Sequence, residues 1–273
     1  MRPEGAAPIG IFDSGLGGLT VARAIFDRLP ADSTLYFGDT ARVPYGPKSP
    51  ATVRRYSLEI LQWLLAQRVK AVVVACNTST AHALEQMRAE SPVPVIGVIE
   101  PGARAALRAA PEGPIGVIGT SGTISSGAYE RAIKGMAPDV TVVSQPCPLF
   151  VPLVEEGWFD HPATELVARE YLAPLRAAGV RAVVLGCTHY PLLKPLLARV
   201  LGPGVVLIDS ADEVAGAVAT ELATRGLGGE PGTGPVTHRF AVSDDAERFQ
   251  AIGARFLGDR LGLAETVALE DSR

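Results

Sequence analysis

The sequence predicts an α/β protein in which two pseudo-symmetric α/β domains with mostly parallel sheets face a shared cleft. Three observations support this class. Short apolar runs alternate with amphipathic segments along the 273 residues, as in parallel sheets covered by helices. The segment VKAVVVACNTST at 69–80 returns as VRAVVLGCTHYP at 180–191. IGIFDSGLG at 9–17 returns as IGVIGTSGT at 115–123, and the similar offsets of the two repeats indicate an internal duplication.

The first half reads as strands and helices in alternation. Its expected strands are Ile9–Phe12, Thr34–Phe37, Val72–Ala75 and Val93–Ile99. Glycines after the first strand lead into a helix that ends near Leu29. The prolines and glycine of ARVPYGP at 41–47 indicate a loop. Ser49 and Pro50 then begin a helix, because serine caps a helix and proline suits its first turn.

The second half repeats this order from Ile115. Its later elements are expected to be strands at Val140–Ser144 and Val205–Ile208 and helices at Thr164–Ala178 and from Ser210 to about Arg225. The letters SADE at 210–213 predict a capping box at the start of the last of these helices. The end of the chain, which has no counterpart in the first repeat, is expected to hold a loop at 226–235, a strand at Thr237–Val242 and a helix at Asp244–Leu257. The expected domains are 1–98 with 208–273, and 99–207.

Composition excludes several classes of protein. A formal net charge of −4 gives no electrostatic case for binding nucleic acid or an anionic membrane. No apolar run reaches the roughly 18–20 residues that cross a bilayer, and the N-terminus lacks the apolar core of a signal peptide, so a cytoplasmic location is expected. Three cysteines are too few for a disulfide framework, and their spacing to the four histidines does not suit a metal.

The repeat places a cysteine, Cys76 or Cys187, after each buried strand and before residues that begin helices. Open α/β sheets bind ligands at this carboxyl edge, so the two thiols are expected to face each other across one cleft, separated by a substrate-sized gap. A thiol at a helix N-terminus has a lowered pKa, so one of the pair should ionise near neutral pH. A thiolate and a thiol on opposite faces of a carbon centre can remove a proton from one face and return one to the other, which inverts the centre.

Polar residues surround both cysteines in the sequence. Asp13, at the tip of the first strand, is expected beside Cys76, and His189 lies two residues past Cys187. Neutral hydroxyl and amide groups, which can bind a carboxylate or an ammonium group, follow the strand ends at Ser14, Asn77, Thr78, Thr120, Thr123 and Thr188.

The motifs IGIFDSGLGGLTV, YFGDTARVPYG, VVACNTSTAHAL, GVIEPG, GVIGTSGTISSGAY, LVEEGW and GCTHYPLL resemble those of the glutamate racemases, within the aspartate/glutamate racemase superfamily. The resemblance spans about residues 9 to 215. It implies a cofactor-independent racemase that supplies D-glutamate for peptidoglycan, with glutamate as its small-molecule partner and a homodimeric assembly. It also implies that Cys76 deprotonates D-glutamate and Cys187 deprotonates L-glutamate, with Asp13, His189 and Glu155 assisting. Ser14, Tyr45, Gly46, Asn77, Thr78, Thr188 and His189 fall on the substrate-binding positions.

Other interpretations compete at single positions. Asp13 and its glycines could form a phosphate loop, although the sequence holds no GxxxxGK[ST] motif. Cys147 is expected to be a buried small hydrophobe. The competing functions are aspartate racemase or another racemase of the superfamily, a thiol peroxidase or redox sensor, and the DNA gyrase inhibition associated with some glutamate racemases.

Overall fold

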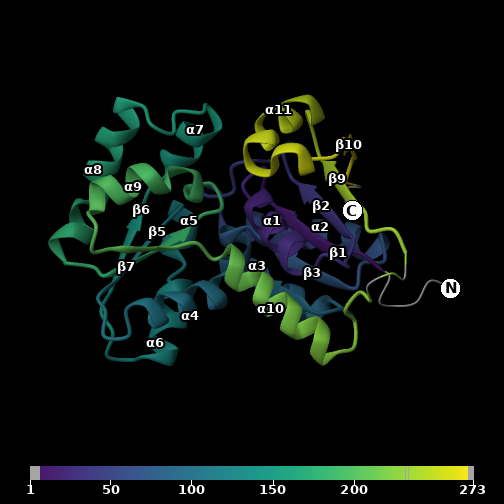
Figure 1. The fold of residues 1–273 in the computed structure, drawn as a ribbon, viewed down its shortest axis with the longest axis horizontal. Helices are drawn as coiled ribbons and strands as arrows, with labels where there is room; N and C mark the ends of the chain where they lie inside the picture. The colour runs from purple at the N-terminus through teal and green to yellow at the C-terminus, as the bar shows by residue number, and fades with distance from the viewer. Residues whose placement is uncertain (1–6, 231, 233, 270–273) are drawn as a thin grey trace.

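The computed structural model describes residues 7–230, 232 and 234–269, and it forms two parallel sheets flanked by helices (Figure 1). The strands are β1 (Ile9–Asp13), β2 (Thr34–Gly38), β3 (Ala71–Val74), β4 (Val95–Gly97), β5 (Ile115–Gly119), β6 (Val142–Pro146), β7 (Ala182–Gly186), β8 (Val206–Ile208), β9 (His238–Val242) and β10 (Ala264–Thr266). The α-helices are α1 (Leu19–Arg28), α2 (Pro50–Ala66), α3 (Asn77–Glu90), α4 (Ile99–Ala109), α5 (Ser121–Ser125), α6 (Ala128–Met136), α7 (Phe150–Glu155), α8 (Pro162–Ala177), α9 (Lys194–Leu201), α10 (Ala211–Thr224) and α11 (Ala246–Leu257). Two short 3₁₀ helices are η2 (Tyr190–Leu193) and η3 (Gly258–Arg260).

The duplication seen in the sequence is present in the strand order. One sheet runs β10-β9-β2-β1-β3-β4 and the other β6-β5-β7-β8, so β2-β1-β3-β4 and β6-β5-β7-β8 are the same arrangement. The registers also correspond: Ile9 pairs with Ala71, and Ile115 pairs with Ala182. All strand pairings between described residues are parallel. The predicted α/β class with two parallel sheets is confirmed.

Burial explains why the central strands are apolar throughout. Every residue of β1, β3, β5 and β7 is buried, because helices cover both faces of each sheet. A strand buried on both faces has no polar side to alternate with, and this gives the continuous apolar runs of the sequence. Ser49 caps α2 by accepting a hydrogen bond from the Thr52 backbone N–H at 3.2 Å, and Pro50 follows it, as expected.

The last part of the chain extends only the first sheet. Strand β9 pairs with β2 from Thr34↔His238 to Gly38↔Val242, and β10 adds beside β9. Figure 1 shows these yellow elements and α11 next to β2 and α1, away from the second sheet. In the second sheet the strand equivalent to β2 is β6, which lies at the edge. The extension therefore covers the β2 edge and breaks the symmetry of the two halves.

Two expectations about strand ends are wrong. The strand expected at Val93–Ile99 spans only Val95–Gly97, because Ile99 already begins α4. Cys187 is not followed directly by an α-helix. The 3₁₀ helix η2 comes first, and α9 begins only at Lys194.

The expected capping box at Ser210 is also wrong. The Ser210 side chain makes no capping hydrogen bond, and its backbone is already helical. Asp209 replaces it, since its Oδ1 accepts a hydrogen bond from the Ala211 backbone N–H at 3.1 Å. The sequence analysis also did not include α4, and it missed α7 and β10, which are too short to show a period.

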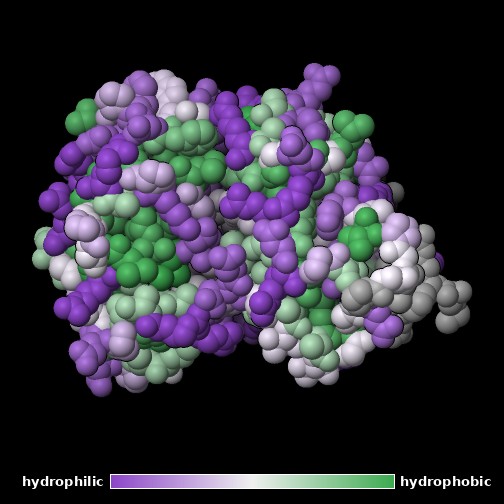
Figure 2. All heavy atoms as spheres, viewed as in Figure 1, coloured by the Kyte–Doolittle hydropathy of each residue, from purple (hydrophilic) through white to green (hydrophobic). Residues whose placement is uncertain are grey.

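The surface in Figure 2 is largely hydrophilic on the face shown, with hydrophobic side chains gathered on its left over the second sheet. Among the described residues, no helix combines the length and the apolar character needed to cross a bilayer.

Candidate active site

A small cavity lies where the carboxyl ends of the two sheets meet. Its volume is about 20 Å³. Its lining comes from the segments that follow β1, β2, β3, β5 and β7, and from α7: Ser14, Val43, Pro44, Tyr45, Gly46, Cys76, Asn77, Thr78, Thr120, Val151, Cys187, Thr188 and His189. A single water needs roughly 10–15 Å³ on such a measure, so the cavity holds about one water molecule. In this conformation the cavity is therefore smaller than an amino-acid substrate, and the substrate-sized gap expected between the two thiols stays a prediction.

Both cysteines of the repeat line this cavity, and both are free thiols. Cys76 is the N-cap of α3, where its Sγ accepts a hydrogen bond from the Ser79 backbone N–H at 3.4 Å. The expectation that one thiol of the pair ionises near neutral pH does not hold for Cys76. Burial, followed by the negative charge of Asp13, raises the pKa of Cys76 to about 11 and outweighs the helix terminus. Cys76 is therefore a protonated thiol at neutral pH.

His189 connects the second cysteine to a carboxylate. Its Nδ1 lies 3.8 Å from Cys187 Sγ, and its Nε2 lies 3.2 Å from Glu155 Oε1. Burial by itself lowers the pKa of His189, but the hydrogen bonds to Cys187 and Glu155, with the charges of Cys187 and Asp13, raise it to about 10. Burial raises the pKa of Glu155, and its hydrogen bond to His189 reverses this, so that the pKa is lowered overall. The pair is therefore an imidazolium and a carboxylate, and it places a positive charge beside Cys187.

Asp13 lies behind the cavity wall and is fully buried. Its Oδ2 accepts a hydrogen bond from the Gly15 backbone N–H at 3.0 Å, and its Oδ1 accepts one from the Thr188 hydroxyl at 3.3 Å. Burial raises the pKa of Asp13, although the charge of His189 and these hydrogen bonds oppose the shift. Asp13 thus contacts the segment after Cys187 as well as influencing Cys76.

The glycines after Asp13 have a packing role. A Cβ atom on Gly17 would lie 2.2 Å from Thr188 Oγ1 and 2.6 Å from His189 Nδ1. A Cβ atom on Gly18 would lie 2.5 Å from Asp13 Cβ. Side chains of the second half therefore fill the space in front of Gly17, where a phosphate loop would need room for its ligand.

Hydroxyl and amide groups form a second wall. Thr78 Oγ1 lies 2.9 Å from Thr120 Oγ1 and 3.1 Å from Thr123 Oγ1, which joins α3 to α5. Thr78 and Thr120 line the cavity, whereas Thr123 lies behind them. Asn77 Oδ1 accepts a hydrogen bond from the Tyr129 hydroxyl at 2.7 Å.

The structure brings together most of the residues expected from the sequence. Asp13, Thr123 and Glu155 do not line the cavity but contact residues that do. The sequence reasoning missed Val43, Pro44, Val151 and Tyr129. Val43 and Pro44 directly precede Tyr45 and Gly46, and Tyr129 is the last residue of the motif GVIGTSGTISSGAY. Their places beside expected site residues in the sequence could have identified them. Within residues 7–230, 232 and 234–269, no three His, Cys, Asp or Glu side chains gather as metal ligands would.

Comparisons with known proteins agree with this geometry. A family model described as Asp/Glu/Hydantoin racemase matches residues 16–218. Glutamate racemases of Geobacter metallireducens and Syntrophus aciditrophicus are 54% and 53% identical over 265 and 262 residues, which is 96% of this chain and 97% of each relative.

Solved structures show the same similarity in three dimensions. The glutamate racemase of Francisella tularensis in complex with D-glutamate has a TM-score of 0.91 at 37% identity, covering 97% of this chain and 99% of that one. The glutamate racemase of Thermus thermophilus in complex with β-chloro-D-alanine has a TM-score of 0.87 at 47% identity, covering 98% and 99%. The aspartate racemase of Picrophilus torridus, at 16% identity and a TM-score of 0.54 over 81% of this chain and 95% of that one, shares the fold alone.

Proposed function

The chain belongs to the Asp/Glu/Hydantoin racemase family, and we propose that it interconverts L-glutamate and D-glutamate by moving a proton between Cα and two cysteine thiols. One observation carries the proposal: Cys76 and Cys187, at corresponding positions of the duplicated sheets, line the same cavity. The enzyme class is an amino-acid isomerase, because relatives at about 50% identity over nearly the whole chain are glutamate racemases.

In the L-to-D direction Cys187 is the base. As a thiolate it takes the α-proton of L-glutamate, and the electron pair left on Cα is delocalised into the substrate carboxylate. The Cys76 thiol gives its proton to the opposite face of Cα, so D-glutamate is released and the two cysteines have exchanged protonation states. The raised pKa of Cys76 supports its role as the acid here, and His189 Nδ1 lies 3.8 Å from Cys187 Sγ, within reach of the second thiol. The reverse reaction uses the same groups in opposite roles.

The remaining site residues hold the substrate or the catalytic groups in the proposed mechanism. Hydroxyl, amide and backbone groups of the lining residues Ser14, Tyr45, Gly46, Asn77, Thr78, Thr120 and Thr188 offer neutral partners for the carboxylates and the ammonium group. Thr123 supports Thr78 and Thr120, and Glu155 keeps His189 charged. Because the closed cavity holds about one water molecule, glutamate enters only when the edges of the two sheets separate.

We further propose that the protein is a cytoplasmic homodimer supplying D-glutamate for peptidoglycan, with domains 1–98 plus 208–273 and 99–207. The pairing of β9 with β2 supports the return of the chain to the first domain, and the pairing of Ile208 with Val184 in the second sheet favours a boundary one residue later than 208. None of the described residues favours the gyrase-directed role.

The test uses purified protein without added cofactor. We expect the circular dichroism of L-glutamate to decay to zero, and Cα to gain deuterium in heavy water. L-aspartate should keep its signal. Decay with aspartate alone would support the alternative racemase, and loss of neither signal would overturn the proposed function. A protein carrying both Cys76→Ala and Cys187→Ala is the control for contaminating activity.

A further inference from the structure

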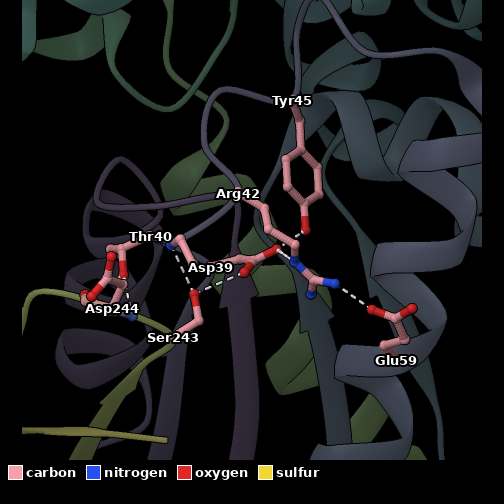
Figure 3. Close-up of polar contacts among 8 residues, drawn as sticks. Asp39, Thr40, Arg42, Tyr45, Glu59, Ser243 and Asp244 are labelled. Atoms are coloured by element: carbon pink, nitrogen blue, oxygen red, sulfur yellow. Dashed lines mark hydrogen bonds and ion pairs between the residues drawn. The ribbon is translucent and has the colours of Figure 1, made fainter. Parts of the chain in front are cut away.

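Asp39 is a fully buried carboxylate that follows β2 and organises the loop behind the site (Figure 3). Its Oδ2 accepts a hydrogen bond from Arg42 Nε at 2.7 Å and another from the Tyr45 hydroxyl. Its Oδ1 accepts a hydrogen bond from the Ser243 hydroxyl at 2.8 Å. Arg42 in turn pairs with Glu59 on α2. This carboxylate therefore joins the lining residue Tyr45 to a residue from the far end of the chain.

Ser243 is the first residue after β9, and its side chain contacts the loop between β2 and α2. Its hydroxyl donates a hydrogen bond to Asp39 and accepts one from the Ala41 backbone N–H at 2.9 Å. The hydroxyl is therefore both a donor and an acceptor toward this loop. The next residue, Asp244, donates its backbone N–H to Thr40 Oγ1 at 2.9 Å. The start of the β2–α2 loop is thus held by the C-terminal extension.

The other end of the same loop rests on the second half. The Gly46 carbonyl oxygen accepts a hydrogen bond from the Gly122 backbone N–H at 2.9 Å. A Cβ atom on Gly46 would lie 2.7 Å from Thr120 Cβ, so the loop backbone passes close against the wall. Residues 43–46, which line the cavity, are therefore fixed between β9 on one side and α5 on the other.

We propose that Ser243 is a positioning residue for the substrate site, acting through Asp39 and the Ala41 backbone to hold Tyr45 and Gly46 against the cavity. The inference rests on the proposed glutamate racemisation and extends it to the C-terminal segment, which carries no residue of the cavity lining. The extension then has a second purpose besides covering the edge of the first sheet, because it also holds the start of the β2–α2 loop.

The chain offers a matched control at the other end of the same strand pair. Ser33 Oγ accepts a hydrogen bond from the Thr237 backbone N–H at 3.1 Å, just before Thr34 pairs with His238. Ser33 and Ser243 are both half-buried, and both link β2 to the β9 segment. Only Ser243 lies at the carboxyl edge that carries the site, so Ser33→Ala removes an equivalent strand contact without touching the loop.

The experiment compares Ser243→Ala, Ser243→Thr and Ser33→Ala by initial rates from both glutamate enantiomers. Loss of a hydrogen bond to a charged group corresponds to on the order of a 10-fold weaker interaction, so we expect KM to rise about 10-fold in Ser243→Ala. We expect kcat to change little, because the cysteines lie on other elements. Ser243→Thr keeps the hydroxyl and should restore KM, and Ser33→Ala should match the unmodified protein.

Hydrogen exchange measured by mass spectrometry gives a readout that does not need activity. Amides of residues 41–46 should exchange faster in Ser243→Ala, and faster exchange in Ser33→Ala should be confined to the region of Thr237. Asp39→Asn, which removes the charge but keeps the shape, should act on residues 41–46 as Ser243→Ala does. Unchanged loop exchange in both loop variants, or equal KM in Ser243→Ala and Ser33→Ala, would overturn the inference. Absence of racemisation in the unmodified protein would instead overturn the proposed function and leave the exchange result standing.

Discussion

The Thr188 hydroxyl donates a hydrogen bond to Asp13, with 3.3 Å between Oγ1 and Oδ1, and this contact joins the two halves of the site. Asp13 ends β1 in the first sheet, and Thr188 directly follows Cys187 in the second. The charge of Asp13 contributes to the raised pKa of Cys76 and also to that of His189. Asp13 therefore acts on both sides of the cavity. This differs from the expectation that Asp13 assists Cys76 and that His189 assists Cys187.

Replacing Asp13 by Asn is expected to lower kcat in both directions by a similar factor. The side chain loses a charge that acts on both sides of the cavity, and the loss of a charged hydrogen-bond partner corresponds to roughly a 10- to 100-fold change in rate.

Replacing His189 by Asn should lower kcat more from L-glutamate than from D-glutamate, because His189 contacts Cys187 alone of the two thiols.

Initial-rate kinetics from each enantiomer measures both effects. The enantiomers have equal free energy, so kcat/KM must fall equally in both directions for any variant, and only kcat and KM can diverge. A kcat loss in Asp13→Asn that is confined to the D-to-L direction would show that Asp13 serves Cys76 only.

Replacing either lining cysteine by alanine should lower kcat/KM by at least about 10²–10⁴-fold, the range for loss of a general acid or base. Each thiol serves one face of Cα, so the other cannot replace it. Cys147→Ala is the matched control, because Cys147 is buried but does not line the cavity. It should keep kcat/KM within a few-fold. Circular dichroism should show that all three variants are folded, and substantial turnover in either Cys76→Ala or Cys187→Ala would contradict the two-base mechanism.

The charge on His189 predicts how stability depends on pH. Its pKa rises from an ordinary value of 6.5 to about 10 in the folded protein, so the folded state binds this proton more tightly than the unfolded state. The resulting stabilisation is fully present below pH 6.5 and is lost as the pH rises toward 10. The raised pKa of Cys76 acts in the same direction, but between about 9 and 11.

Urea unfolding at pH 6.5, 8 and 9 separates the two contributions. One pKa unit corresponds to about 1.4 kcal/mol, so the free energy of unfolding should fall by about 1 kcal/mol or more across this window. The His189→Gln variant should show a flatter dependence over the same range. Identical pH dependence of the two proteins would mean that His189 is not held protonated by the fold.

The sequence repeat was sufficient to predict the sheets and the paired cysteines. Cys76 lies two residues after the end of β3 and Cys187 directly after the end of β7, and the repeated apolar run before each cysteine is enough to predict this. The residue types after each strand also predicted hydroxyl and amide groups at this edge, and Ser14, Asn77, Thr78, Thr120 and Thr188 do line the cavity. These features depend on residues that are close together in the chain, so they can be predicted from the sequence.

The electrostatics and the supports could not be predicted in this way. A helix terminus by itself lowers the pKa of a thiol, but burial and the nearby Asp13 raise that of Cys76, and both depend on packing across the sheets. Ser243 reaches Asp39 over 204 residues of sequence, with no local pattern to mark it. The closed cavity is likewise a property of how the two halves meet.

The close approach at Gly17 leads to the last prediction, which concerns the fit between the halves. A Cβ atom there would lie 2.2 Å from Thr188 Oγ1 and 2.6 Å from His189 Nδ1, so Gly17→Ala must push the segment after Cys187 away from Asp13. A misplacement of about 1 Å can cost about 10²-fold in rate, and we expect kcat/KM to fall by at least roughly that factor. The matched control is Gly216→Ala in α10, where the added Cβ would have no atom within 4 Å apart from its chain neighbours and the backbone of its own helix. It should keep full activity and gain up to about 1 kcal/mol in stability, because alanine favours a helix more than glycine does. Steady-state kinetics and thermal unfolding of both variants provide the measurement. If Gly17→Ala retained full activity, the halves would be able to move apart at this contact without cost, and the contact from Thr188 to Asp13 would not be required for catalysis.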